Sequence, residues 1–504
     1  MSSSRFAVVD LVVLLAYLAG TTWLGLRLGR RQNNASDYFV AGRSLPWWAV
    51  MFSIVATETS ALTFISIPGL SYVGDLGFLQ VCAGYILGRV VVAYVLLPRY
   101  FEGELVTAYT LLETRFGKET RRFTSIVFMV TRAMADAVRV FATAIPLALI
   151  IGPVMPRQYL MPVAILILGA LTIFYTYRGG MRAVVWTELL QAGVYLTGGV
   201  AAALLLGRSV PGGWPAIVSA ARASGKLGLI STYTGFDRPH TIFAGLIGGA
   251  FLAMASHGAD QIIVQRLLSA RSLRDAQKAI IGSGIVVFFQ FTLFLTVGLG
   301  LWALYQGADF RVPDSIFPTF IVERMPHGLL GLIVAAIVAA TMSTHSGAIN
   351  ALAAATTHDI YLPLSGRVAS DPTTFRAARL FALAWGVVLT IGAMLFPEGR
   401  TPVVVIALSI ASFTYGALLG GFFLGIYNAR AVQRDAITGM SFGIIAMAGV
   451  VFAKPLVAAY PALTGTLGLF SNVAWPWYVL IGTTITVAVG SLSSLTHRGR
   501  SPAR

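Results

Sequence analysis

The sequence predicts an all-α polytopic membrane protein with about 13 transmembrane helices, and three observations support this fold class. Of the 504 residues, 57% are hydrophobic and only 11% are charged, whereas soluble proteins carry about 25% charged residues. Apolar stretches of about 18 residues or more recur from end to end, and each can cross ~30 Å of hydrocarbon as a helix. Basic residues gather in alternate short loops, as the positive-inside rule expects.

Thirteen apolar segments follow one another along the chain, each with the length of a helix that crosses the membrane. The first segment is preceded by one arginine and followed by Arg27, Arg30 and Arg31, the reverse of a cleaved signal peptide, so we expect it to remain as a helix. The predicted spans are 6–28, 47–73, 77–98, 124–152, 158–177, 183–206, 240–262, 279–305, 328–357, 378–396, 402–428, 435–453 and 476–495.

The distribution of Lys and Arg predicts the orientation of these spans. With the N-terminus outside and the C-terminus cytoplasmic, 23 basic residues fall on the inner side, 10 on the outer side and three (Arg89, Arg132 and Arg139) within spans. Flipping the chain reverses this ratio, so we expect this orientation in the plasma (inner) membrane. The formal charge of +16 therefore reflects topology and predicts the lipid bilayer, not nucleic acid, as the partner.

Two further observations exclude other classes of site. The single cysteine, Cys82, excludes an intramolecular disulfide and argues against a cysteine-based metal centre. No HExxH motif or comparable catalytic constellation occurs in the sequence, so we do not expect an enzyme.

Two spans have sequences that are poor candidates for continuous helices. Residues 56–69 combine hydroxyl groups, a carboxylate and a Pro-Gly pair, and residues 245–258 contain four glycines. If the first span is set aside, these are the first and sixth helices of a ten-helix core. Interrupted helices at corresponding positions of two halves are typical of inverted-repeat transporters, whose binding site lies at mid-membrane. The alternative is that the glycines only allow close packing between helices.

Three stretches resemble motifs of one transporter family. They are "DYFVAGRSLPWW" (37–48), "GGMRAVVWTELLQ" (179–191) and "DQIIVQRLLSARSLRDAQKA" (260–279). By these motifs the chain is identified as a member of the sodium:solute symporter family, and the similarity extends from about residue 6 to about residue 430. Members of this family carry sugars, proline, sialic acid, iodide or vitamins. The resemblance implies a five-plus-five inverted-repeat (LeuT-like) core that works by alternating access.

This architecture predicts a division of the chain into five parts. They are an extra helix and cytoplasmic loop (1–46), the first repeat (47–206), an outer loop (207–239), the second repeat (240–428), and two final helices with a short tail (429–504). The outer loop contains Gly, Ser and Pro, and we expect it to cover the extracellular face.

A sodium site is predicted in the polar stretch "AATMSTHSGAIN" (339–350). Ala340, Ser343 and Thr344 stand at i, i+3 and i+4, so they share one helix face. A small hard cation needs several oxygen ligands, and the remaining ones must come from unwound backbone nearby. The alternative is that the hydroxyls only bond the carbonyls one turn earlier. The resemblance implies that the carbonyls of Ala56 and Thr59 complete the Na⁺ site.

A second cation site depends on Glu188. Some members of the resembled family place an aspartate after Trp-Thr and pair it with hydroxyls of the eighth core helix, but here Glu188 follows Trp186-Thr187. On that helix Ser343 and Ser346 remain, and Gly347 replaces a further hydroxyl. The longer carboxylate either reaches into the space that the glycine leaves, or the site is lost and Glu188 only guides the departing ion. We favour the loss, and hence one sodium per solute.

The solute is expected to bind near polar residues of the first and third core helices. Glu58 lies in the interrupted span, and a carboxylate at mid-membrane suggests function unless it serves a structural ion pair. Arg132, Asp136 and Arg139 share one helix face. One arginine can neutralise Asp136 while the other meets Glu58 or a substrate carboxylate, which favours a charged or zwitterionic solute. The alternative is a packing network. The set is completed by Ser60, Thr63 and Phe78, the last as an aromatic lid.

The sequence therefore predicts a sodium-coupled importer of a small organic solute, of organic-acid, amino-acid-like or sugar type, acting as a monomer. Two alternatives remain at this point. A proton-coupled symporter of the same fold would use Glu58 and Glu188 as titratable groups. A non-transporting membrane sensor is the other, and the short tail after about Leu495 counts against it. Neither Arg89 nor His345 has an assigned role.

Overall fold

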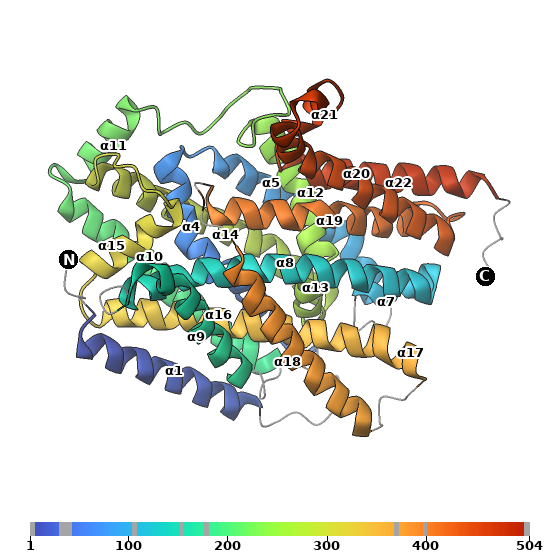
Figure 1. The fold of residues 1–504 in the computed structure, drawn as a ribbon, viewed down its shortest axis with the longest axis horizontal. Helices are drawn as coiled ribbons and strands as arrows, with labels where there is room; N and C mark the ends of the chain where they lie inside the picture. Colours follow the sequence, from blue (N-terminus) through green and yellow to red (C-terminus); the bar gives the residue numbers. More distant parts are fainter. Residues whose placement is uncertain are drawn as a thin grey trace.

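The computed structural model of the chain describes residues 6–29, 43–102, 108–151, 155–175, 181–366, 372–396, 399 and 401–497. Within these ranges the chain is helical, apart from turns and one isolated bridge between Leu45 and Ala270. Long helices lie side by side in one bundle, and α9 and α18 cross it at an angle (Figure 1).

The predicted spans correspond to helices whose ends differ from the prediction by a few residues. The membrane-spanning candidates are α1 (Val8–Gly29), α3 (Trp47–Glu58) with α4 (Ala61–Val73), α5 (Phe78–Val91) continuing through η2 (Val92–Leu96) into α6 (Leu97–Phe101), α8 (Lys118–Ile151), α9 (Arg157–Tyr175), α10 (Met181–Ser209), η4 (Ala244–Gly248) with α12 (Gly249–Gly258), α14 (Leu273–Leu304), α16 (Leu329–Ala355), α18 (Pro372–Met394), α19 (Val403–Tyr427), α20 (Gln433–Ala459) and α22 (Trp477–Leu495).

Shorter helices connect these segments, several of them at the two ends of the bundle. Figure 1 shows α11 and α15 at one end and α7 and α17 at the other. The connecting helices are α7 (Ala108–Phe116), α11 (Gly213–Ala223), α13 (Gln261–Leu268), η5 (Pro313–Ser315), α15 (Ile316–Arg324), η6 (Thr356–Tyr361), α17 (Leu362–Ser365), η7 (Pro461–Leu463) and α21 (Thr464–Ser471).

Length and composition mark most of these helices as membrane spans. Among the described residues, nine helices are long and apolar enough to cross a membrane, and the bent pair α3–α4 makes a tenth. Three shorter apolar helices (Val8–Thr21, Gln158–Ile173 and Ala244–Gly258) coincide with the remaining predicted spans. The fold is therefore that of a multi-pass membrane protein, and the count of thirteen spans stays a prediction.

The first interrupted span is broken, as the sequence predicts. α3 ends at Glu58, α4 begins at Ala61, and the two axes differ in direction by 61°. Thr59 leaves the helical conformation (φ −82°, ψ 60°), and Ser60 is extended. The break therefore leaves backbone polar groups inside the bundle without the hydrogen bonds that a regular helix would provide.

The second predicted interruption, within 245–258, is wrong. The chain there forms the π-helical turn η4 and continues directly into α12, and it breaks only at Ala259, before α13. The glycines allow close packing instead. A Cβ on Gly245 would lie 2.6 Å from the backbone of Gln80, and one on Gly249 would lie 2.7 Å from the carbonyl oxygen of Val81. The packing alternative thus holds for this stretch, because two helix backbones approach too closely for side chains.

The additional helix α1 is anchored to α16 through a buried carboxylate. Asp10 is fully buried and accepts hydrogen bonds from the backbone amides of Gly328 (2.7 Å) and Gly331 (3.2 Å), at the first turn of α16. The His327 ring also contacts Asp10, with 2.8 Å between Nδ1 and Oδ2. Asp10 therefore caps a helix that lies far away in sequence, where unpaired amides and the helix dipole favour negative charge.

The loop 207–239 packs against the ends of α4 and α5. Lys226 donates from Nζ to the carbonyl oxygens of Tyr72 (2.7 Å) and Gly74 (3.0 Å), which end α4. The amide of Ser231 donates to the Gln80 side chain at 3.2 Å. The loop therefore covers the end of α4, and its place on the extracellular face stays a prediction.

Candidate functional site

The break between α3 and α4 is held by side chains that bond its backbone and hydroxyls. Thr63 donates from Oγ1 to the carbonyl oxygen of Glu58 at 2.8 Å, and Gln290 of α14 donates from Nε2 to Thr59 Oγ1 at 2.6 Å. Ser60 is buried and begins α4. In the described part of the chain, no backbone amide of a turn, loop or helix end donates to the carbonyl oxygen of Ala56 or Thr59. Both oxygens are therefore available to a cation.

The opposing helix, α16, carries the polar stretch as one continuous helix through residues 339–350. Ala340 and Ser346 are buried, and Thr344 is half-buried. The side chain of Ser343 lies outside the described residues. Thr341 donates from Oγ1 to the carbonyl oxygen of Ile337 at 2.7 Å, so this hydroxyl is used within its own helix.

The two sides of the predicted sodium site approach each other through aromatic packing. Phe64 of α4 stacks on Tyr195 of α10, with 4.9 Å between ring centroids. The Tyr195 hydroxyl donates to the carbonyl oxygen of Ala336 at 3.1 Å, one turn before Ala340 on α16. The broken helix and the polar face of α16 thus share one region of the core, although none of these contacts joins the predicted ligands directly.

Glu58 pairs with Arg89, a residue to which the sequence assigned no role. Arg89 of α5 is fully buried, forms an ion pair with Glu58 and donates to Ser283 Oγ at 3.0 Å. His257 of α12 lies 3.5 Å from the same carboxylate. The interpretation in which Glu58 meets an arginine of the third core helix is therefore wrong. The sequence did contain a signal for this pair: Arg89 is a lone arginine inside an apolar span, and a charge there requires a partner.

Arg132, Asp136 and Arg139 come together on α8, as their spacing predicts, and His345 of α16 joins them. Asp136 is buried, and its ion-pair distances to Arg132 and Arg139 are both 3.9 Å. The Nδ1 atom of His345 is hydrogen-bonded to Asp136. His345 was the polar residue of the 339–350 stretch without a predicted role, and the structure places it on the partner of both arginines.

This cluster has unused hydrogen-bonding capacity. Contacts of 3.9 Å are too long for hydrogen bonds. Four of its buried polar atoms have no partner among the described residues: Arg132 Nε, Arg139 Nε, Asp136 Oδ1 and His345 Nε2. An unpaired buried polar group costs about 1–3 kcal/mol. The cluster is therefore suited to a polar ligand that supplies the missing hydrogen-bond partners.

The charges of the cluster favour an anionic ligand. Two guanidinium groups share the carboxylate of Asp136, and no other carboxylate lies within 4.0 Å of either guanidinium in the described part of the chain. Asp260 acts on Arg139 from farther away, but its oxygens already accept from the Tyr415 hydroxyl (2.7 Å) and the Ile262 amide (2.8 Å). A carboxylate bound here would gain charge-assisted, potentially bidentate hydrogen bonds.

Glu188 contacts residues of α3 and α13, and its place in a second cation site with Ser343 and Ser346 stays a prediction. Arg266 of α13 approaches Glu188 Oε1 at 2.6 Å. Ser53 and Thr57 of α3 donate to Glu188 Oε2 at 3.1 Å and 3.4 Å. These contacts occupy both carboxylate oxygens, and Arg266 is a site residue that sequence reasoning missed.

The predicted lid Phe78 packs within an aromatic cluster. It is fully buried and stacks on Phe291 with 5.6 Å between centroids and 9° between ring planes. Trp475 and His240 complete its ring contacts. These packing contacts are sufficient to explain its burial, so a role in covering the solute stays a prediction.

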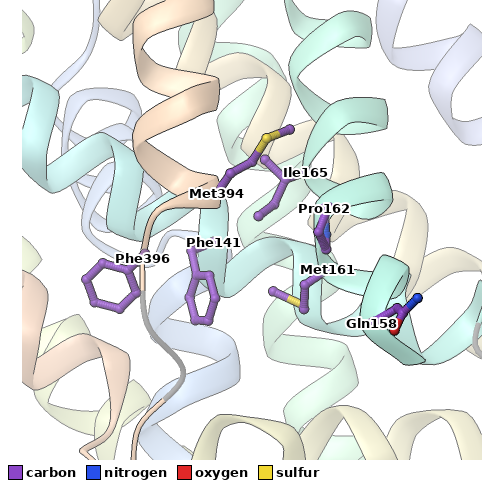
Figure 2. Close-up of a pocket in the computed structure, with 7 residues that line it drawn as sticks. All are labelled: Phe141, Gln158, Met161, Pro162, Ile165, Met394 and Phe396. Carbon is purple, nitrogen blue, oxygen red and sulfur yellow. The ribbon is translucent and has the colours of Figure 1, made fainter. Parts of the chain in front are cut away.

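An apolar pocket of about 280 Å³ lies between α8, α9 and the end of α18 (Figure 2). Gln158 is its one polar side chain, and none of the predicted site residues lines it. Its lining consists of Phe141, Gln158, Met161, Pro162, Ile165, Met394 and Phe396. This lining offers a small charged solute no charged side chain, so we place the candidate site at the polar cluster instead.

A buried carboxylate outside the spans joins three segments around α4, the second half of the broken helix. Asp314 of η5 is fully buried, accepts a hydrogen bond from Ser66 of α4, and accepts another from the Val403 amide at 2.9 Å. Val403 is the first residue of α19, where helix amides lack partners. Desolvation raises the pKa of Asp314 to about 6, although these hydrogen bonds oppose the rise.

The raised pKa of Asp314 predicts a specific pH dependence of stability. Because the pKa is higher in the folded protein than the usual value of 3.8, folding favours proton uptake. The contribution is present near pH 4 and is lost as the pH rises through about 6. We expect the melting temperature of the purified protein in detergent to fall over this interval, and to fall less in Asp314→Asn. Parallel melting curves for both proteins would contradict the assignment.

The broken helix at the centre of an apolar bundle, flanked by buried arginines and carboxylates, defines a secondary transporter. A sequence model of the sodium:solute symporter family matches residues 38–443. The sodium/sialic acid symporter NanT of Aliivibrio fischeri is 30% identical over 479 residues, which cover 93% of this chain and 92% of the relative. The chain therefore belongs to the sodium:solute symporter family and is a sodium-coupled symporter of a small organic solute.

Solved structures agree with the fold. A sodium-coupled sialic acid symporter, solved in a substrate-bound outward-open state that revealed a novel sodium site, superimposes with a TM-score of 0.81 at 28% identity, covering 99% of this chain and 100% of that one. Mhp1, a nucleobase-cation-symport-1 family transporter, shares only the fold, with a TM-score of 0.53 at 13% identity over 93% of this chain and 98% of that one. The core is therefore LeuT-like, as predicted.

Proposed function

We propose that the chain imports a small anionic or zwitterionic organic solute together with sodium. The observation that carries this proposal is the cluster on α8, where Arg132 and Arg139 share one carboxylate at 3.9 Å and keep unpaired nitrogen atoms. A solute carboxylate would complete those hydrogen bonds. The relatives that carry sialic acid, itself a carboxylate, support the same class of solute.

Sodium is proposed to bind between the break and α16. The ligands would be the carbonyl oxygens of Ala56, Thr59 and Ala340 and the hydroxyls of Ser343 and Thr344. The unpaired carbonyls at the break support this assignment, because a hard cation prefers several neutral oxygens at short distance. Sodium would then hold the broken helix against α16 and complete the neighbouring solute site.

Proton coupling is the less favourable alternative. It would require Glu58 or Glu188 to gain and lose a proton during transport. Both carboxylates are instead held in ion pairs, Glu58 with Arg89 and Glu188 with Arg266. Neutralising either one would leave a buried arginine without its partner, which is strongly unfavourable.

The remaining features of the proposal concern topology. The two inverted repeats would comprise 47–206 and 240–428, with the N-terminus outside the cell and the C-terminus in the cytoplasm, as the arginine distribution favours. The protein would work as a monomer in the plasma (inner) membrane of the cell. Figure 1 is consistent with this topology, because α1 begins at the end of the bundle that carries α11 and α15.

Uptake into proteoliposomes tests the proposal. Purified protein would be assayed at fixed pH with radiolabelled sialic acid, lactate, glycine and glucose, under an inward sodium gradient or an equal potassium gradient. We expect accumulation of an anion or zwitterion only with sodium. Accumulation of glucose while the acids and the amino acid stay inert would contradict the solute class. Accumulation driven by a proton gradient without sodium would contradict the coupling.

A further inference from the structure

The carboxylate of Asp136 stops short of both arginines on its own helix. Its Oδ1 atom lies 3.9 Å from a guanidinium nitrogen of Arg132 and 3.9 Å from one of Arg139. A charge-assisted hydrogen bond between such groups spans about 2.7–2.9 Å. Oδ1 is buried and has no hydrogen-bond partner in the described part of the chain. A displacement of about 1 Å would therefore let the carboxylate bond either arginine.

A side chain of α16 holds Asp136 in this position. The Nδ1 atom of His345 donates a hydrogen bond to Asp136 Oδ2, and both residues are 1% exposed. Within the described ranges this is the only hydrogen bond of the carboxylate. Because a buried carboxylate without a partner is strongly unfavourable, the position of α16 determines where the carboxylate of Asp136 lies.

His345 directly follows Thr344, a ligand of the proposed sodium site. Both belong to the continuous helix α16, in which successive side chains point about 100° apart. Thr344 can therefore face the break between α3 and α4 while His345 faces α8. Since the two residues share one rigid helix, a shift of α16 that brings Thr344 to a sodium ion also moves His345 relative to Asp136.

His345 and the two arginines compete for the same carboxylate. While His345 bonds Asp136, the Nε atoms of Arg132 and Arg139 stay without partners and can bond a solute carboxylate. If His345 withdrew, the nearest donors to Asp136 would be the two guanidinium groups. An arginine bonded to Asp136 offers the solute fewer donors and less positive charge. The carboxylate keeps a partner in both arrangements, but only one of them leaves the arginines open.

We propose that Asp136 is an internal counter-ion that occupies the solute-binding arginines when sodium is absent, and that sodium binding releases them through His345. With sodium at Thr344, α16 presents His345 to Asp136 and the arginines accept a solute, which is the arrangement of the contacts described above. Without sodium, α16 withdraws, Asp136 bonds an arginine, and the solute binds weakly. His345 is a positioning residue because it contacts neither ion nor solute. The inference deepens the proposed function and rests on its two sites.

The proposal is tested by equilibrium binding of radiolabelled sialic acid, lactate and glycine to the purified chain, in saturating sodium and with potassium in its place. Sodium should raise the wild-type affinity for the solute that binds by about 5- to 150-fold, the usual range for two coupled sites. Asp136→Asn removes the internal charge, so it should bind the solute without sodium about as tightly as the wild type does with sodium. His345→Ala should bind it weakly in both conditions.

The opposite results expected for these two variants separate the switch from damage to the fold, which would weaken binding in both. The double variant should behave as Asp136→Asn, because His345 acts only through Asp136. His345→Asn keeps a donor close to the position of Nδ1 and should retain part of the sodium effect. Thr143→Val is the matched control on α8. Its buried hydroxyl bonds only the carbonyl oxygens of Arg139 (3.0 Å) and Val140 (3.1 Å) of its own helix, so the sodium effect should stay as in the wild type.

Melting curves establish that each variant is folded, and a second measurement decides if Asp136→Asn is not. The solute must raise the affinity for ²²Na⁺ by the same factor as sodium raises the affinity for the solute. This effect should vanish in His345→Ala and persist in His345→Asn. A wild type that binds none of the three solutes would reject the proposed function and this inference with it. A wild type that binds a solute without any sodium effect, or with an effect that folded His345→Ala retains in full, would reject the switch alone.

Discussion

Replacing both Ser343 and Thr344 with alanine is expected to raise the sodium concentration for half-maximal uptake by about 100-fold. Each substitution removes one oxygen ligand from the proposed site, and the loss of ~1.4 kcal/mol per ligand corresponds to about tenfold in affinity. The measurement is initial uptake in proteoliposomes as a function of external sodium. The maximal rate at saturating sodium should change much less, because the solute site is left intact.

Two matched variants on α16 control for nonspecific damage to the helix. Thr341→Ala removes a hydroxyl that already bonds the Ile337 carbonyl, so sodium dependence should stay as in the wild type. Thr344→Ser keeps the hydroxyl and should restore most of the affinity. Unchanged sodium dependence in the double mutant would reject these two residues as ligands.

Arg139→Gln is expected to lower the affinity for the solute by about 10- to 100-fold. The variant removes charge-assisted hydrogen bonds to a carboxylate, each contributing about 1.5–3 kcal/mol. Arg139 is the more accessible arginine, with 22% of its side chain exposed against 12% for Arg132. Arg139→Lys should recover only part of the affinity, because an ammonium group cannot form the bidentate contact. Solute-dependent thermal stabilisation and the concentration for half-maximal uptake measure the effect.

The control for this prediction is Arg122→Gln on the same helix. Arg122 pairs with Glu119 at 2.7 Å near the surface, and such exposed pairs contribute little to stability. Its removal should leave solute affinity unchanged. An equal loss in both variants would show that charge on α8 acts through stability alone. Full affinity in Arg139→Gln and in Arg132→Gln would reject the cluster as the solute site.

The number of coupled ions decides whether membrane potential drives uptake. A monoanion carried with one sodium ion moves no net charge, whereas a zwitterion carried with one sodium gains ~2.3 kcal/mol per 100 mV. The pairing of Glu188 with Arg266 supports a single coupled ion, because the carboxylate already has a cationic partner. Imposed potentials in proteoliposomes therefore distinguish the two types of solute.

Most of the fold followed from patterns that the membrane imposes on a sequence. Apolar length predicted the spans, because lipid offers no partner for an unpaired backbone group. The break at Thr59 and Ser60 was predictable from polar residues beside a Pro-Gly pair. The break assigned to 245–258 was wrong because glycine has two uses. It can interrupt a helix or allow a close approach, and only the neighbouring backbone of α5 decides between them.

The polar network was less predictable because pairing is a long-range property. Spacing on one helix brought Arg132, Asp136 and Arg139 together correctly. It could not reveal Arg89 as the partner of Glu58, 31 residues away on another helix. The partner of Glu188, Arg266, lies 78 residues along the chain, in a segment that the sequence had marked only by resemblance. Within a membrane each buried charge demands a partner, but the sequence does not state which one.

The capping of α16 by Asp10 has a consequence for how the protein is made. The ribosome produces α1 long before α16, because the amide of Gly328 that donates to Asp10 lies 318 residues later. During that interval the carboxylate lacks these partners, because the start of α16 does not yet exist. Synthesis proceeds at about 5–20 residues per second, so the wait is on the order of tens of seconds. The docking of α1 on α16 therefore waits until the first turn of α16 has been made, long after α1 itself.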